Sequence, residues 1–348
     1  MNYQIDCISN PFKDHNFNLD WSSESAFHFH QSLPGYKPTP LLQLKNFSKS
    51  IGINQCLVKD ESHRLNLNAF KVLGASYAMA MEIAKYLKLD LNNLTYEIIK
   101  KHSDQIKNLT FTTATDGNHG RAVAWMARKL GRKALIYMPQ GTVPTRVRAI
   151  EQEGADVFVI DRGYDIAVKM ANTRVDEANK KSRNHFWSLI QDTAWDGYEE
   201  IPSDIMKGYW TQIHEITEQI GKEKIDVLFL QTGVGSWAAS IIGYIMKEWQ
   251  NPPACISVEP HSANCLFESI KTGNRVSVEN NETTTMAGLN CGSVSTLGWQ
   301  ILKNGLVGSI SISDNSNREF AFSKGIKITF WSNSAKPVLK TEDILNFS

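Results

Sequence analysis

The sequence contains little cysteine, and its few cysteines are far apart. There are five in 348 residues: Cys7, Cys56, Cys255, Cys265 and Cys291. No pair has the Cys-x-x-Cys spacing, and five scattered residues do not make a disulfide framework. We therefore expect free thiols and a cytoplasmic location, while a bond between Cys265 and Cys291 stays open as an alternative.

Long apolar runs, an excess of one charge and metal-binding motifs are also missing. No run reaches the ~18 apolar residues of a membrane span, and the first residues lack the basic-then-apolar order of a signal peptide. The 37 basic and 36 acidic residues leave a formal net charge of +1, and the nine histidines form neither an HExxH motif nor a Cys/His cluster. We expect no membrane partner, no nucleic-acid partner and no metal.

The sequence does contain a repeated order of strand, glycine-containing turn and helix. This order predicts an α/β fold with parallel sheets covered by helices on both faces. Strands are expected at 110–114, 134–139, 156–160, 185–190, 225–231 and 254–260, and helices at 71–87, 122–130, 144–152, 164–181, 201–220 and 237–248. Residues 1–33 show no clear period and are expected to be an irregular arm.

Lys71 lies where a predicted loop becomes a helix. Asn68 is expected to cap that helix, since its side-chain oxygen can accept a backbone N–H two or three residues on. The partial positive charge of the helix N-terminus favours the neutral, nucleophilic amine that a Schiff-base lysine needs. An ordinary solvated lysine is the simpler interpretation unless other motifs support this one.

A glycine turn at 233–236 follows an apolar strand and opens a helix. Glycines let the backbone approach an anion, and the helix N-terminus offers free N–H groups. Gly233, Gly235 and Ala238 also match G-x-G-x-x-A, and Glu259 ends the next strand, so a dinucleotide site is an alternative. That alternative gives no role to the lysine or to the acidic turns, and an anion site is favoured.

Two further turns carry acids where predicted strands end, at the sheet edge where α/β proteins bind ligands. Asp116 is a candidate general base, Asn118 can donate to a ligand oxygen, and His119 is more often structural than catalytic in such a place. Asp192 offers a second acid, although capping of the following helix explains it equally well. Two carboxylates on opposite sides of a ligand would serve two faces of one carbon.

Together these segments resemble the pyridoxal-phosphate (PLP) enzymes of fold type II, the tryptophan-synthase-β-like family, and within it the diaminopropionate ammonia-lyases. The resemblance covers roughly residues 26–303. It is carried by the motifs PGYKPTPL at 34–41, KDES at 59–62, NAFKVLG at 68–74, TATDGNHGR at 113–121, QDTAW at 191–195, GVGS at 233–236, VEP at 258–260 and MAGLNCG at 286–292.

The resemblance implies a two-domain PLP fold type II and a role for each motif. Lys71 would hold the cofactor as a Schiff base and move protons, and Asn118 would bond its ring hydroxyl. Asp116 and Lys71 would take the α-proton from opposite faces, and Asp192 would hold the substrate amine or assist. The residues expected to hold the phosphate are Gly233, Val234, Gly235 and Ser236.

The implied reaction is α,β-elimination of D- and L-2,3-diaminopropionate, a small amino-acid substrate, to pyruvate and ammonia by a homodimer. The large domain would comprise 1–74 and 186–348, and the smaller α/β domain 75–185. After Leu306 the sequence departs from the family, and the expected glycine- and serine-containing segment beside the pyridine nitrogen is not found. The alternatives are another PLP lyase or dehydratase acting on serine or threonine, and a catalytically inactive, C-terminally short relative.

Overall fold

The structure is a computed structural model that describes residues 5–14, 16–17, 19–21, 24–181, 186–279 and 284–314. By internal contacts the chain forms two units. Unit 1 comprises Met1–Asp20, Thr39–Glu61 and Ile213–Ser348, and unit 2 comprises Trp21–Pro38 and Ser62–Gln212. Unit 2 is wider than the 75–185 segment predicted as the smaller domain, and that division stays a prediction.

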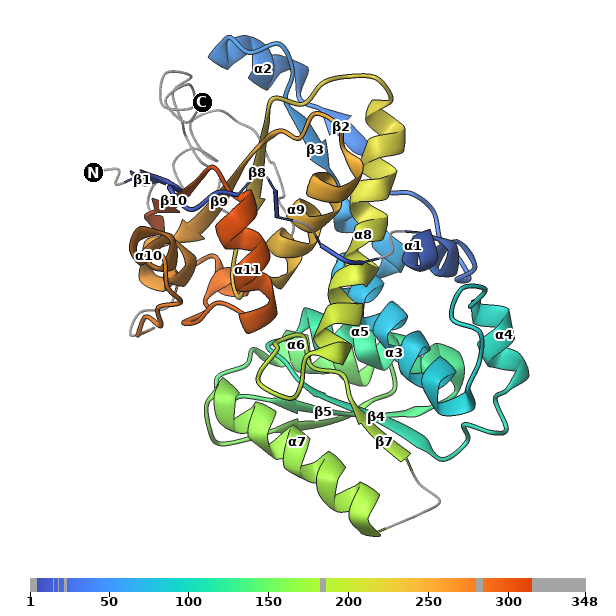
Figure 1. The fold of residues 1–348 in the computed structure, drawn as a ribbon. Coiled ribbons are helices and arrows are strands. Elements are labelled where there is room, and N and C mark those ends of the chain that lie inside the picture. Colours follow the sequence, from blue (N-terminus) through green and yellow to red (C-terminus); the bar gives the residue numbers. More distant parts are fainter. Residues whose placement is uncertain are drawn as a thin grey trace. The chain divides into compact units, whose positions relative to one another are not determined.

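Unit 2 is built on a four-stranded parallel sheet in the order β6-β5-β4-β7. Every residue of the inner strand β4 is buried, as expected for a parallel strand between two covered faces. In Figure 1, α7 (Tyr164–Lys181) covers one face of the sheet and α5 (Asn118–Leu130), backed by α3 (Lys71–Leu87), covers the other. The strands are β4 (Leu109–Ala114), β5 (Lys133–Met138), β6 (Asp156–Val159) and β7 (Phe186–Leu189).

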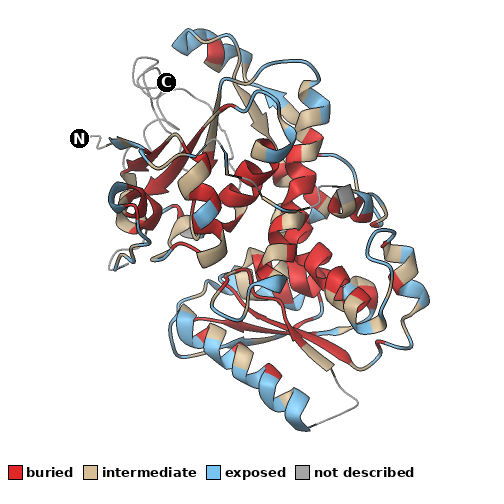
Figure 2. Ribbon diagram, in the orientation of Figure 1, coloured by how far each residue is buried: buried red, intermediate tan, exposed pale blue. Residues whose placement is uncertain are grey.

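The helices of unit 2 surround this sheet, and their buried sides form its core (Figure 2). They are α1 (Glu24–Gln31), α3 (Lys71–Leu87), α4 (Tyr96–Lys101), α5 (Asn118–Leu130), α6 (Pro144–Glu151) and α7 (Tyr164–Lys181), together with the first part of α8 (Glu200–Ile220). Two glycines let α3 and α8 approach closely. A Cβ on Gly208 would lie 2.5 Å from the backbone oxygen of Leu73, and one on Gly74 would lie 2.5 Å from Cε1 of Tyr209.

Unit 1 contains a second four-stranded sheet in the order β1-β10-β9-β8. Strands β8 (Val227–Gln231), β9 (Ala254–Pro260) and β10 (Gly308–Ile312) are parallel, whereas β1 (Ile5–Ser9) pairs antiparallel with β10. A short antiparallel pair joins β2 (Leu41–Gln43) to β3 (Leu57–Lys59). The helices of this unit are α2 (Lys45–Ile51), α9 (Ser236–Glu248), α10 (Cys265–Thr272) and α11 (Thr296–Gly305).

The fold class predicted from the sequence is confirmed, and the expected irregular arm is wrong. Helix α1 and strand β1 both lie within residues 1–33. The strand is five residues long, and the strand that it pairs with is almost at the other end of the described chain, so no local pattern indicates it. The sequence is expected to depart from the family after Leu306. The structure describes this part of the chain only up to residue 314, including β10 at Gly308–Ile312, and residues 315–348 lie outside the described residues.

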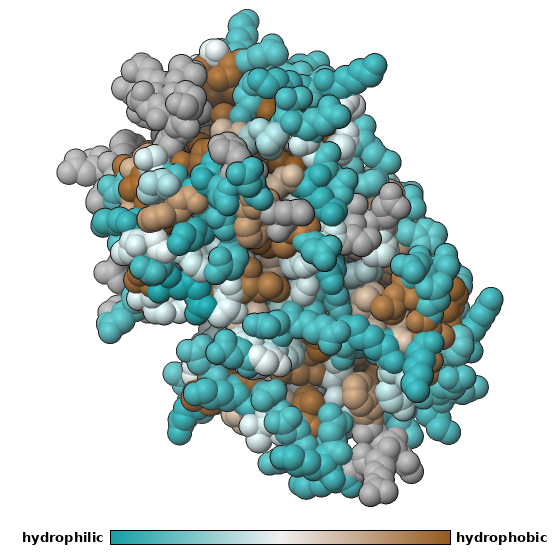
Figure 3. Space-filling model, in the orientation of Figure 1, coloured by the Kyte–Doolittle hydropathy of each residue, from teal (hydrophilic) through white to brown (hydrophobic). Residues whose placement is uncertain are grey.

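The structure has a largely polar surface in Figure 3, and its cysteines form no disulfide bond. The face shown in Figure 3 is largely hydrophilic, with apolar patches between the polar side chains. None of the five cysteines forms a disulfide bond, and this includes Cys265 and Cys291. None of the described helices is long and apolar enough to cross a membrane, and no group of three or more potential metal ligands occurs among the described residues.

Candidate active site

Lys71 is the first residue of α3, and its amine is paired with a carboxylate. The Nζ atom lies 2.7 Å from Oδ2 of Asp192, which makes a charged hydrogen bond. The rings of Phe70 and Tyr209 lie near the same amine, with centroids 5.8 and 5.9 Å from Nζ. Asp192 holds the amine in place. Because the Lys71 side chain is still 24% exposed, the amine remains accessible to a small molecule.

Asp192 lies in the polar turn after β7 and is buried. Burial alone would raise the pKa of Asp192, but the positive charge of Lys71 and its hydrogen bond to the carboxylate outweigh burial and hold the pKa well below 3.8. Asp192 is therefore an anion at neutral pH. The negative charge of Asp192 favours the ammonium form of Lys71. The neutral amine expected from the sequence therefore forms only after the ammonium group loses a proton.

His119 stands behind this pair as a buried, neutral ring. Its Nε2 lies 2.6 Å from the backbone oxygen of Ile190, which can only accept, so Nε2 carries the proton. Its Nδ1 lies 3.8 Å from Oδ2 of Asp192 and has no hydrogen-bond partner among the described residues. Burial lowers the pKa of His119, against the opposing effect of Asp192. His119 therefore lies beside Asp192 as a neutral ring, without a hydrogen bond to it.

Asp116 lies in the tight turn between β4 and α5. The hydroxyl of Thr115 fixes this turn by accepting hydrogen bonds from the N–H groups of Gly117 and Gly120, at 3.0 and 3.1 Å. From α6, Nη1 of Arg146 donates to the backbone oxygen of Asp116 at 3.2 Å. The turn is therefore held from both sides.

The carboxyl group of Asp116 has mixed surroundings. The residue keeps an exposed surface, yet nearby protein removes enough water to raise the pKa of Asp116. Arg146 and Lys71 oppose this rise, whereas the negative charge of Asp192 adds to it. A carboxyl group whose pKa lies above 3.8 is better suited to accept and return a proton near neutral pH.

Asn118 opens α5 directly after this turn and is half-buried. No hydrogen bond of its side-chain amide to another described residue occurs. The amide is therefore available to a ligand, and its contact with the cofactor stays a prediction.

The glycine turn 233–236 belongs to unit 1 and connects β8 to α9. Gly235 has a left-handed φ of 89° and directly precedes Ser236, the first residue of the helix. A Cβ on Gly233 would lie 3.1 Å from Sγ of Cys291, so no larger residue fits there without movement. The N-terminus of α9 has no side-chain cap at Gly235, and a helix N-terminus behind a glycine turn is a common place for an anion to bind.

Two helix-cap interpretations made from the sequence are wrong, and two residues next to the site were not predicted. Asn68 is not the cap of α3, because Phe70 precedes the helix and Asn68 itself has a left-handed φ of 56°. Asp192 is not a helix cap either, since the next helix starts only at Glu200. Tyr209 and Arg146 contact the site from α8 and α6, and no motif in the sequence indicates them.

A family model described as pyridoxal-phosphate dependent enzyme matches residues 32–321. The chain belongs to this family. Pyridoxal phosphate is therefore its cofactor, and the dinucleotide alternative for the glycine turn is not favoured.

Two curated relatives share the same name. The diaminopropionate ammonia-lyases of Salmonella typhimurium and of Escherichia coli strain K12 are each 42% identical over 294 residues. The alignments cover 82% and 83% of this chain and 71% of each relative. A biosynthetic threonine dehydratase of Arabidopsis thaliana is only 28% identical over 242 residues, covering 68% of this chain and 34% of the dehydratase.

Solved structures of the Escherichia coli diaminopropionate ammonia-lyase have the same fold. The complex with an aminoacrylate-PLP azomethine reaction intermediate has a TM-score of 0.81 and 38% identity, and covers 91% of this chain and 78% of that one. The complex with D-serine has a TM-score of 0.82 and 38% identity, and covers 90% and 78%. These matches support the predicted PLP fold type II.

The residues of this chain fit the cofactor chemically. Unit 2 supplies a primary amine at Lys71 and an unbonded amide at Asn118. Unit 1 supplies an uncapped helix N-terminus behind two glycines, which suits a phosphate. An aldehyde binds to an amine and a phosphate binds to backbone N–H groups, so each reactive end of pyridoxal phosphate has a suitable partner.

Proposed function

We propose that this protein is a diaminopropionate ammonia-lyase that acts on both mirror forms of 2,3-diaminopropionate. The substrate would lose its α-proton and its β-amino group, and the remaining fragment would hydrolyse. One molecule of substrate and one of water thus give one pyruvate and two ammonia. The observation that carries the proposal is the 42% identity to two enzymes of that name across most of the chain.

The cofactor, when bound, takes up the electron pair that stays on the α-carbon when the proton is removed. The chain would hold it by the amine of Lys71, by the amide of Asn118 against the ring hydroxyl, and by the phosphate-binding turn. That turn consists of Gly233, Val234, Gly235 and Ser236. These assignments rest on the family resemblance and on the fit of each group.

Lys71 and Asp116 would act as two bases on opposite faces of the α-carbon. Lys71 is accessible enough to reach a substrate, and Asp116 has the raised pKa that suits proton transfer. Asp192 would hold a positive charge close to the reaction, either the ammonium of Lys71, as in this structure, or the amine of the substrate. These separate roles explain why the residue in the turn after β4 is an acid, Asp116, rather than a neutral residue.

The first test is the visible absorbance of the purified protein before and after borohydride, with peptide mapping of the reduced product. We expect a yellow protein whose reduced label lies on Lys71. Label on another lysine would contradict the proposed attachment. A protein that stays colourless with added pyridoxal phosphate would instead favour the catalytically inactive alternative.

Substrate choice is tested by measuring pyruvate from D- and L-diaminopropionate, with L-serine as the competing substrate, and 2-oxobutyrate from L-threonine. We expect both isomers of diaminopropionate to be the preferred substrates. Faster turnover of serine or threonine would support the dehydratase alternative, which the 28% identity to a threonine dehydratase does not favour.

We also propose that the protein works as a homodimer in the cytoplasm. The family resemblance supports the dimer, and the absence of a disulfide bond among the five cysteines supports a reducing compartment. Sedimentation velocity at several protein concentrations would measure the oligomeric state, and a monomer at all of them would contradict the dimer.

A further inference from the structure

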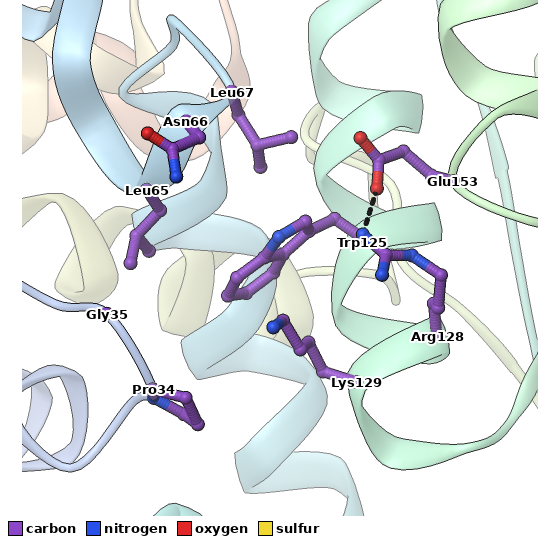
Figure 4. Close-up of a pocket in the computed structure, with 9 residues that line it drawn as sticks. All are labelled: Pro34, Gly35, Leu65, Asn66, Leu67, Trp125, Arg128, Lys129 and Glu153. Atoms are coloured by element: carbon purple, nitrogen blue, oxygen red, sulfur yellow. Dashed lines mark hydrogen bonds and ion pairs between the residues drawn. The ribbon is translucent and has the colours of Figure 1, made fainter.

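Unit 2 contains a cavity that none of the proposed catalytic groups lines. Its volume is about 220 Å³. One wall is the outer face of α5 with Trp125, Arg128 and Lys129, and Figure 4 shows these side chains facing the loop at 65–67. The remaining lining residues are Pro34, Gly35, Leu65, Asn66, Leu67 and Glu153.

The charges that line this cavity favour an anion. Glu153 is its one acid, and both of its oxygens are already engaged. Oε1 accepts from Nε and Nη2 of Arg121 at 3.3 Å each, and Oε2 accepts from Nη2 of Arg128 at 2.6 Å. Arg128 donates no further hydrogen bond to the described residues, and its side chain is 49% exposed. Its remaining N–H donors, with the ammonium of Lys129, are therefore available to a ligand.

The lining of the cavity is mainly polar, and its smaller apolar part can contact a small carbon body on that anion. The ring of Trp125 is nearly buried, and Nζ of Lys129 lies 5.5 Å from its centroid. Leu65, Leu67 and Pro34 supply apolar contacts on the opposite side. The volume is below the ~300–1,000 Å³ of sites for drug-sized ligands, so the occupant must be small.

The same cavity touches the segment that leads to Lys71. Leu65 and Asn66 line it with left-handed φ angles of 48° and 59°, a conformation that non-glycine residues rarely adopt without a structural or functional reason. Nη1 of Arg121 donates to the backbone oxygen of Leu67 at 3.1 Å, while the same guanidinium binds Glu153. A hydrogen-bonded path therefore joins Arg128 to the loop before Lys71.

We propose that this cavity is a binding site for a small organic anion, a carboxylate or phosphate on a short planar or apolar body, that stabilises the 64–70 loop. Arg128 and Lys129 bind the charge, and Trp125 and Leu65 contact the body. Binding at this place does not depend on the proposed function. It would give the protein a second small-molecule site next to the segment that positions Lys71.

The test is isothermal titration calorimetry of the cofactor-loaded full chain with phenylphosphate and with benzoate. Inorganic phosphate, which has no carbon body, and benzamide, which has no charge, are the matched probes. We expect at least one of the ring-bearing anions to bind with one site per chain, inorganic phosphate to bind more weakly, and benzamide not to bind. Benzoate alone would identify a carboxylate site and phenylphosphate alone a phosphate site. No binding of either anion, or equal binding of benzamide, would overturn the proposal.

Variants locate the binding. Arg128→Gln and Lys129→Gln should each weaken it about tenfold, as the loss of one charge-assisted hydrogen bond does. Lys129→Gln leaves the Arg128–Glu153 pair intact, so its effect cannot come from a disrupted ion pair. Arg162→Gln removes an exposed arginine outside the cavity and should change nothing. Unaltered binding in both cavity variants would place the ligand elsewhere and contradict the proposal.

Amide hydrogen exchange measures the effect on the loop without using activity. We expect peptides covering 64–70 to exchange more slowly when the bound anion is present, and this slowing to be reduced in Lys129→Gln. Unchanged exchange at saturation would refute the stabilisation of the loop.

Discussion

Asp192 and Lys71 form a charged hydrogen bond, and the neutral ring of His119 lies behind the carboxylate. The sequence places all of these residues in turns or at a helix start, but the pairing is a property of the folded chain. Lys71 and Asp192 are 121 residues apart, and no pattern links a helix that begins after one loop with a turn that follows a distant strand. Residue types and their motifs could be predicted, whereas partners could not.

Asp192→Asn should lower the free energy of unfolding of the cofactor-free protein by about 1.5–3 kcal/mol, the usual contribution of a hydrogen bond between charged groups. The pKa of folded Asp192 lies below the ordinary 3.8, so the unfolded chain binds the proton first. The stabilisation is therefore complete above about pH 5 and is lost as the pH falls further. Urea unfolding of both proteins from pH 7 to pH 4 measures this, and identical curves at pH 7 would contradict it.

Asp116→Asn should reduce turnover of D-diaminopropionate by about 10²–10⁴-fold, the range for loss of a general base, and should affect the L isomer much less. Equal losses on both isomers would refute the two-base assignment. Steady-state assays with each pure isomer provide the measurement.

Arg146→Gln should move the acidic limb of D-isomer turnover to higher pH. Arg146 opposes the effect of burial on Asp116, so its removal raises the pKa of that carboxyl further, and the basic form is then reached only at higher pH. Arg148→Gln, an exposed arginine on the same helix, is the control. A pH profile that is the same in both variants would show that Arg146 does not act on Asp116.

Among the elements, periodic and buried segments were predictable, and elements held by distant partners were not. Helix α3 has the bounds that the sequence predicts, because its small and large apolar residues repeat at helical spacing. Strands β1 and β10 were missed, since each is short and they pair with each other across nearly the whole chain. The close approach of α3 and α8 was also missed, because a glycine in a helix does not by itself indicate what it meets.

Gly208→Ala should destabilise the protein by about 1–3 kcal/mol or more, as overpacking does. Its new Cβ would meet backbone atoms of Leu73 and Gly74, which cannot turn away. Gly74→Ala should cost less, because it meets side-chain atoms of Tyr209 and Ile205 that can shift. Gly163→Ala has open space around it and is the control. Urea unfolding gives the order of the three variants in free energy of unfolding. A Gly208→Ala variant as stable as the original protein would show that α3 and α8 can move apart.

At the scale of the whole molecule, burial should control the chemistry of the cysteines. Cys7 is exposed, whereas Cys255 and Cys265 are buried, and burial raises the pKa of Cys255 to about 12. Burial also raises the pKa of Cys265. We expect a thiol reagent to label Cys7 quickly and these two only after unfolding. Mass spectrometry of peptides from native and denatured protein measures the extent of labelling at each cysteine. Rapid labelling of Cys265 in the native protein would be inconsistent with this fold.

The fold class and the family were accessible from the sequence because their signals are local and repeated. The order of strand, glycine turn and helix fixes the class, and the motifs identify the family before any contact is known. The composition of the two units was not accessible. Segment Thr39–Glu61 belongs to unit 1, although in the sequence it lies between two segments of unit 2. Only tertiary contacts show to which unit such a segment belongs.

The pairing of β1 with β10 has a consequence for biosynthesis. Ile5 pairs with Ile312, so during synthesis the first described strand must wait for the last described strand. At about 5–20 residues per second, that wait is roughly 15–60 s. Unit 2 is complete at Gln212 and can fold meanwhile, whereas the nascent edge of the other sheet stays without its partner strand for the whole interval. An unpaired strand edge can pair with another chain, so slow translation of the last third would prolong the exposure of the nascent protein to aggregation.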